Sequence, residues 1–151
     1  PYTARGVYLG VKAAAKRALG ADTMAGVHVA IQGVGSVGGG LARYLASDGA
    51  RLTIADADAE RAATLAAELG ADTVAVADIM TVEADIFSPN ALGAILTAES
   101  VAALKAKAVA GGANNQLATG KEGHMLAERA ILYAPDYVIN AGGIINVLRH
   151  I

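Results

Sequence analysis

Three glycines near the first apolar run of the chain have the spacing of a phosphate-binding loop. Gly33, Gly35 and Gly38 form a G-x-G-x-x-G pattern between a strand-like run at 27–31 and a helix-like segment at 37–46. In such a loop the first glycine allows a tight turn, the second leaves room for a diphosphate, and the third lets the helix pack close to the strand. The pattern therefore predicts a dinucleotide-binding loop, and the alternative is a glycine-rich turn with only a structural role.

The start of the following helix strengthens this prediction. Free N–H groups and the positive end of the helix dipole attract a diphosphate at a helix start, and Ser36 and Val37 occupy that position. The Ser36 hydroxyl could donate to the diphosphate or could simply cap the helix. We expect both residues to contact the cofactor.

An acid after the next strand-like run predicts which cofactor is bound. Asp56 follows the run at 51–55, about 20 residues after the loop, where a carboxylate meets the ribose hydroxyls of NAD. Its negative charge would repel the 2′-phosphate of NADP. The alternative is a surface acid at a strand end. Arg61 could compensate for this charge, but it lies one turn into the next helix and is expected to be a solvated cation.

The composition suits an α/β protein. The 151 residues fit one domain, and the 54% hydrophobic and 4% aromatic content indicates a core of small aliphatic residues, as in a buried parallel sheet. Helices are expected at 2–19, 59–69, 97–104, 121–130 and 144–150, and further strands at 73–76, 84–88, 106–110, 131–133 and 137–139. This alternation predicts a Rossmann-type, doubly wound, mostly parallel sheet with helices on both faces.

Several classes of partner are not expected. A formal charge of −2 without a basic run argues against nucleic acid. No apolar stretch approaches the roughly 20 residues of a membrane helix, and no signal peptide is expected. The absence of cysteine excludes disulfides and favours a cytoplasmic location. The three histidines lack metal-ligand spacing, so no metal is expected, and His28 is interpreted as a structural residue of its strand.

Four further segments carry a resemblance to a known family. They are 3–7 (TARGV), 88–93 (SPNALG), 110–117 (AGGANNQL) and 133–143 (YAPDYVINAGG). Together with the glycine loop they resemble the cofactor domain of the glutamate/leucine/phenylalanine/valine dehydrogenases, most closely the leucine, phenylalanine and valine branch. The resemblance covers essentially the whole chain. It implies NAD-dependent oxidative deamination of an amino acid to a 2-oxo acid and ammonia.

The resemblance also implies roles for particular residues. Thr3 and the Ala113-Asn114 turn would lie against the nicotinamide and its carboxamide, and Asn140 would face the amino-acid substrate. From the residues alone, Asn140 could equally cap a final helix. Asn90 departs from the leucine-type pattern, which usually has cysteine there, although an amide can still form hydrogen bonds.

The resemblance does not extend to the residues that transfer protons in the family. In the family, a lysine in a glycine-rich motif and an aspartate transfer protons, and both belong to a preceding substrate domain. The lysines of this chain, at 12, 16, 105, 107 and 121, are not in such a motif. We therefore expect residues 1–151 to be a single NAD-binding domain without the amino-terminal substrate domain, with no catalytic residue of its own, and inactive in isolation. Self-association is left open.

Two other functions remain as alternatives. The chain could be a stand-alone or engineered nucleotide-binding module without chemistry. It could also be a Rossmann domain for another hydride transfer, such as that of a hydroxy-acid or alanine dehydrogenase, but the Asn140-Ala141-Gly142-Gly143 segment speaks against this.

Overall fold

The computed structural model describes residues 2–91, 95–113 and 116–134. The strands are β1 (His28–Gln32), β2 (Arg51–Ala55), β3 (Asp72–Thr73), β4 (Ile86–Pro89), β5 (Ala108–Val109) and β6 (Leu132–Tyr133). The helices are α1 (Tyr2–Leu19), α2 (Ser36–Ser47), α3 (Ala59–Leu69), α4 (Ala98–Ala103) and α5 (Lys121–Glu128), with a 3₁₀ helix, η1 (Val76–Thr81). Within the described residues, each predicted helix is present to within a few residues of its expected bounds.

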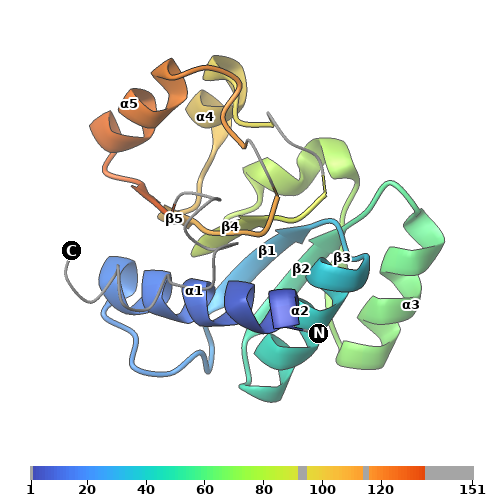
Figure 1. Ribbon diagram of the computed structural model, residues 1–151. Helices are drawn as coiled ribbons and strands as arrows, with labels where there is room; N and C mark the ends of the chain where they lie inside the picture. The colour runs from blue at the N-terminus through green and yellow to red at the C-terminus, as the bar shows by residue number, and fades with distance from the viewer. Residues whose placement is uncertain (1, 92–94, 114–115, 135–151) are drawn as a thin grey trace.

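The strands form one parallel sheet in the order expected of a Rossmann fold. They lie in the order β3-β2-β1-β4-β5-β6, and every neighbouring pair is parallel. The chain therefore starts in the middle of the sheet, winds outward to one edge, and returns to build the other half from β4 (Figure 1). The carboxyl ends of all strands lie along one edge, and the change of direction between β1 and β4 creates the usual ligand crevice there.

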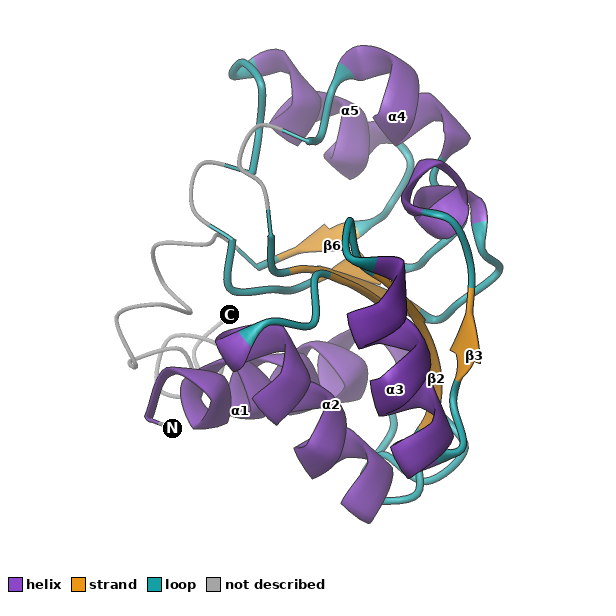
Figure 2. Cartoon of the chain, turned by 90° about the vertical axis from the view of Figure 1, so that its right-hand side faces the viewer, coloured by secondary structure: helices purple, strands orange, loops and turns teal. Residues whose placement is uncertain are grey.

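Helices cover both faces of the sheet, as Figure 2 shows with α1 and α2 on one side and α4 and α5 on the other. Alternate strand residues enter two separate cores, because successive side chains of a strand point to opposite faces. Val29 and Ile31 pack with α1, α2 and α3, whereas Ala30 packs with η1, α4 and α5. Both faces of β1 are thus buried, which explains the apolar run of Val29, Ala30 and Ile31 in the strand.

Several helix ends follow the local sequence. The Asp58 side chain accepts a hydrogen bond from the Arg61 N–H and caps α3, and Gly70 ends that helix with a positive φ of 68°. Thr97 caps α4 through a reciprocal capping box with Ser100. These caps confirm the positions predicted for the two helices.

The third strand is shorter than predicted, and the prediction of strand at 74–76 was wrong. The strand covers only Asp72–Thr73, and residues 76–81 form η1 in place of a continued strand. The apolar residues at 74–76 suggested a strand, but the segment turns to bury Ile79, which is 1% exposed, against the second core. This turn brings Val76 to the edge of the ligand crevice.

None of the helices in the described part of the chain is both long and apolar enough to cross a lipid bilayer.

Candidate functional site

The first and third glycines of the loop are required by packing. Gly33 has a φ of +90°, and a Cβ there would lie 2.5 Å from the Ala91 Cβ. A Cβ on Gly38 would lie only 1.7 Å from the Gly33 carbonyl oxygen. Both distances are far below van der Waals contact, so the turn and the close approach of α2 to β1 depend on these two glycines.

Gly35 is different, because its surroundings leave room for a side chain. It is the N-cap of α2 and has an ordinary φ of −72°. A Cβ on Gly35 would meet only the Arg61 Nη1 atom, at 3.8 Å, which is normal contact. The fold does not require a glycine here. The missing side chain instead leaves open space at the start of α2, as expected if a ligand approaches the backbone.

The start of α2 presents backbone N–H groups without a side-chain cap. Ser36 is the first residue of the helix and is exposed, Val37 is half-buried, and Gly35 supplies no capping side chain. The first N–H groups of a helix have no partner within the helix. Together with the helix dipole they form a site suited to an anion.

Asp56 directly follows β2, and its side chain, which is nearly buried, ties this strand to the glycine loop. Its side chain is 7% exposed, so it is not a surface acid. The Val34 N–H donates to Oδ2 at 2.8 Å, and the Asp58 N–H donates to Oδ1 at 2.8 Å. Burial acts to raise the pKa of Asp56, but these hydrogen bonds and Arg61 outweigh it and hold the pKa below its usual value. The carboxylate is therefore ionised at neutral pH.

Arg61 was interpreted wrongly as a solvated cation. Its Nη2 atom lies 3.2 Å from Asp56 Oδ1 in an ion pair, while its side chain remains 52% exposed. A side chain in the first turn of a helix points back toward the helix start, so Arg61 reaches the end of β2 from α3. The guanidinium group thus lies next to Asp56 and also next to the space that a side chain on Gly35 would occupy.

These residues enclose a pocket of about 300 Å³ at the carboxyl ends of β1, β2 and β4. It is lined by Gln32, Gly33, Gly35, Asp56, Ala57, Arg61, Val76, Asn90 and Ala91. The pocket combines an anion-binding helix start, a carboxylate, and apolar surface from Ala57, Val76 and Ala91. This combination matches the diphosphate, ribose and adenine of a dinucleotide.

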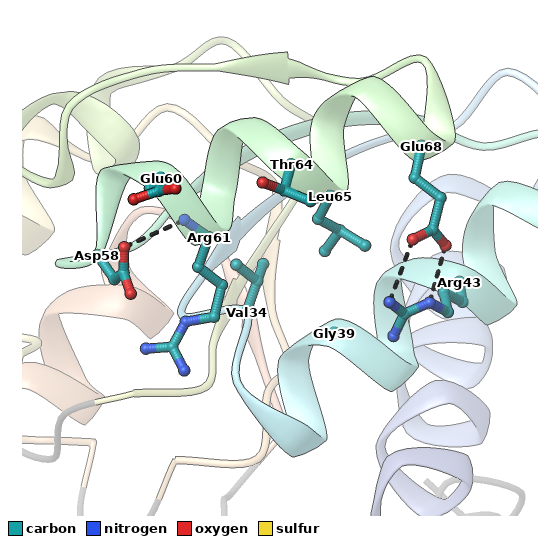
Figure 3. Close-up of a pocket in the computed structure, with 9 residues that line it drawn as sticks. All are labelled: Val34, Gly39, Arg43, Asp58, Glu60, Arg61, Thr64, Leu65 and Glu68. Atoms are coloured by element: carbon teal, nitrogen blue, oxygen red, sulfur yellow. Dashed lines mark hydrogen bonds and ion pairs between the residues drawn. The ribbon is translucent and has the colours of Figure 1, made fainter.

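A second hollow, of about 370 Å³, lies between α2 and α3 (Figure 3). The ion pair between Arg43 and Glu68, with Nε and Oε2 2.9 Å apart, closes one end, and Arg61 extends toward Val34 at the other. This hollow does not include the strand ends, and its arginine at 43 is already paired. The pocket at the strand ends is therefore the better candidate site.

The loops after β4 and β5 form the other wall of the crevice. Asn90 Nδ2 donates to the Ser88 carbonyl and hydroxyl oxygens, each at 3.0 Å, and Asn90 Oδ1 accepts from the Gly112 N–H at 2.8 Å. The Ala113 N–H donates to the Pro89 carbonyl at 3.0 Å. The amide at position 90 therefore joins two loops, a role that a cysteine could not fill as well because it is a weak hydrogen-bond former.

The remaining predicted residues are placed only in part. Thr3 lies in the first turn of α1, and Ala113 is 5% exposed in the loop after β5. Asn114 and Asn140 lie outside the described residues. The described residues contain no cluster of three or more potential metal ligands.

His28 lies away from this site. It begins β1, at the opposite end of the strand from Gln32, and its Nε2 atom is 2.8 Å from the Thr53 hydroxyl. Burial lowers the pKa of His28. The His28 ring thus has a hydrogen-bond partner within the sheet, as expected of a structural histidine.

Comparison with known proteins identifies the family. Residues 54–147 match the model of the Glutamate/Leucine/Phenylalanine/Valine dehydrogenase family. The chain belongs to this family. It is 53% identical over 147 residues to leucine dehydrogenase of Thermoactinomyces intermedius, covering 97% of this chain but 40% of that protein.

A solved structure agrees with this assignment. The crystal structure of L-tryptophan dehydrogenase from Nostoc punctiforme matches with a TM-score of 0.91 and 43% identity, covering 97% of this chain and 44% of that chain. The chain thus spans about two-fifths of the length of these amino-acid dehydrogenases. The resemblance found in the sequence and the predicted α/β fold are both confirmed.

Proposed function

We propose that this chain binds NAD(H) and forms the cofactor domain of an amino-acid dehydrogenase that deaminates an L-amino acid to a 2-oxo acid and ammonia. The observation that carries the proposal is the open space above Gly35, next to the uncapped start of α2 and the buried carboxylate of Asp56. Family membership supplies the reaction class. We also propose a cytoplasmic location, because the sequence has no cysteine and disulfides are typical of proteins in oxidising compartments.

Each part of the pocket has a role in this proposal. The N–H groups at Gly35, Ser36 and Val37 hold the diphosphate, while Gly33 and Gly38 shape the loop. Asp56 accepts hydrogen bonds from the adenosine ribose. Its hydrogen bonds hold the pKa of Asp56 below its usual value, so the carboxylate is charged at neutral pH and can accept them.

The nicotinamide end would lie farther along the crevice, toward the loops after β4 and β5. By the family resemblance, Thr3, Ala113 and Asn114 contact the nicotinamide, and Asn140 faces the amino acid. The bound cofactor supplies the hydride acceptor, and the chain supplies binding and orientation. General acid–base groups, which typically contribute about 10²–10⁴-fold each, are expected from the substrate domain.

Calorimetric titration of the chain with NAD and NADP tests the cofactor assignment. NAD should bind, and NADP should bind at least about tenfold more weakly, a difference of about 1.4 kcal/mol, because Asp56 repels the 2′-phosphate. Equal or tighter binding of NADP would contradict the role of Asp56. No binding of either dinucleotide would overturn the proposed function.

A second assay distinguishes a cofactor domain from a module without chemistry. The chain spans about 40% of the leucine dehydrogenase to which it is 53% identical, so we expect no deamination of leucine, phenylalanine, valine or glutamate by this chain alone. Fusion of a related substrate domain ahead of Pro1 should restore NADH formation. A fusion that binds NAD but remains inactive would favour the module, and rapid deamination by the bare chain would show that a catalytic group was missed.

A further inference from the structure

Gln32 is a buried polar residue of the nucleotide pocket with no role in the loop geometry described above. It is the last residue of β1 and is 7% exposed. It lines the pocket together with Gly33 and Asp56. Its side-chain oxygen is buried and has no hydrogen-bond partner among the residues that the structure describes.

An unpaired buried oxygen needs a physical reason. Leaving a buried polar group unpaired is unfavourable, because the group loses its hydrogen bonds to water, and nearly all such groups in folded proteins have a partner. Gln116 also has an unpaired side-chain oxygen, but its Nε2 atom donates to the carbonyls of Gly111 and Ala113, at 3.1 and 2.8 Å. Gln116 thus stabilises a loop. No comparable bond of Gln32 within the described residues offsets its cost.

The position of Gln32 points to the adenosine end of the pocket. Its strand neighbours are Ala55 of β2 and Pro89 of β4, so it lies between the strand that leads to Asp56 and the strand that leads to Asn90. Successive side chains of a strand point to opposite faces of the sheet. The Gln32 side chain therefore lies on the face of Ala30, on which η1 packs. The amide consequently lies below the part of the pocket that Asp56 and Val76 border.

We propose that the Gln32 amide binds a hydroxyl group of the adenosine ribose, beside Asp56. This inference rests on the proposed NAD-binding function. A ribose hydroxyl both donates and accepts, and a glutamine amide presents either its oxygen or its NH₂ group when it rotates about its last torsion. Adenine also offers both kinds of group, through its amino group and its ring nitrogens, so donor and acceptor chemistry alone does not choose between sugar and base. The position of Gln32 does, because it lines the pocket with Asp56 and pairs with Ala55, the residue before Asp56, and the ribose is the group that Asp56 is proposed to bind.

The proposal predicts opposite effects on stability and on binding. Gln32→Met removes the amide but keeps an unbranched side chain of similar length, so the ligand-free protein should melt at the same or a higher temperature. Its affinity for ADP and for NAD should fall about tenfold, which corresponds to about 1.4 kcal/mol. Thr53→Val is the matched control, because it removes a buried hydroxyl that does have a partner, His28, on the same sheet. This control should lower the melting temperature and leave ADP affinity unchanged.

Nucleotide analogues identify the hydroxyl partner. The tenfold difference between wild type and Gln32→Met should persist with inosine diphosphate, which lacks the adenine amino group. It should shrink toward onefold with either 2′-deoxy-ADP or 3′-deoxy-ADP, because one of them lacks the proposed partner. A difference that disappears only with inosine diphosphate would assign Gln32 to the base and overturn the ribose assignment.

Other outcomes separate this inference from the proposed function. If wild type binds ADP and NAD and Gln32→Met binds both equally well, the inference is wrong and the proposed function stands. If wild type binds neither, both are overturned. Should Gln32→Met fail to fold, Gln32→Asn, which keeps the amide but shortens its reach, should fold and still lose ADP affinity. Unfolding of both variants would show that Gln32 is a structural residue.

Discussion

The clearest test of the glycine loop is the same small substitution at two of its glycines. A methyl group on Gly35 would lie 3.8 Å from the Arg61 guanidinium, with the backbone at a φ of −72° that any residue adopts. A methyl group on Gly38 would lie 1.7 Å from the Gly33 carbonyl oxygen. Gly35→Ala should therefore leave the fold unchanged, whereas Gly38→Ala should force α2 away from β1.

Gly38→Ala should mainly lower stability, whereas Gly35→Ala should mainly lower NAD affinity. Overpacking typically costs about 1–3 kcal/mol, so Gly38→Ala should lower the melting temperature by roughly 2–12 °C at about 2–4 °C per kcal/mol for a chain of this size. Gly35→Ala should change it by less than about 2 °C. Loss of one hydrogen bond to the charged diphosphate, about 1.5–3 kcal/mol, should nevertheless weaken NAD binding by roughly 10-fold to 150-fold. Gly35→Val, with a larger side chain, should abolish binding.

Thermal melting followed by circular dichroism and NAD titration by calorimetry measure these two effects separately. Gly35→Ala should lose affinity without losing stability. If folded Gly35→Ala and Gly35→Val bound NAD as well as wild type, the diphosphate would not approach at Gly35, and the anion site assigned to the start of α2 would be wrong.

Three further predictions concern Asp56, Arg61 and Asn140. Asp56→Ser should raise the affinity for NADP and so narrow the preference for NAD, because it removes the negative charge and frees Arg61 for the 2′-phosphate. Adding Arg61→Gln to this variant should reverse most of the gain in NADP affinity. Asp56→Asn should reduce the free energy of unfolding at pH 7 by about 1–2 kcal/mol, through the hydrogen bonds that the charged group accepts. The pKa of Asp56 is lower in the folded protein, so this stabilisation is present above the unfolded pKa of about 3.9 and is lost as pH falls through the folded pKa. The free energies of unfolding of wild type and variant, measured by urea denaturation, should therefore converge at low pH. A difference that does not change with pH would contradict this. In an active fusion with a substrate domain, Asn140→Ala should reduce kcat/KM for the amino acid far more than NAD affinity, and an equal loss of both would argue against a substrate-facing role.

The parts of the fold that could be predicted contain residues whose type is determined by local sterics or by helix capping. Gly33 and Gly38 cannot carry a side chain where the helix meets the strand, and Asp58 and Thr97 cap their helices with their own oxygen atoms. These are local requirements, so the sequence displays them. The strand at 74–76 was predicted wrongly because its apolar residues pack with η1 against the second core, and this depends on residues far away in the chain.

The site was predictable to a similar extent. The spacing of the glycines and Asp56 located the crevice, because these residues follow strand ends that the topology brings together. Arg61 was misjudged because only the backward reach of a first-turn side chain brings it to Asp56. Gln32 carried no motif at all. Its significance depends on the burial of its oxygen between two strands, which no local pattern records.

The bond from the Val34 N–H to Asp56 also bears on how quickly and at what entropic cost a nucleotide binds. Because the carboxylate already holds the turn between β1 and α2, ordering of that turn belongs to folding and not to binding. A nucleotide would meet a rigid rim, and the amide proton of Val34 would already be protected from exchange with solvent before any ligand arrives. The same bond means that Val34 does not contribute its N–H to the phosphates. One N–H group of the loop, that of Val34, thus stabilises the loop conformation. The N–H groups of the first turn of α2 remain available to bind the anion.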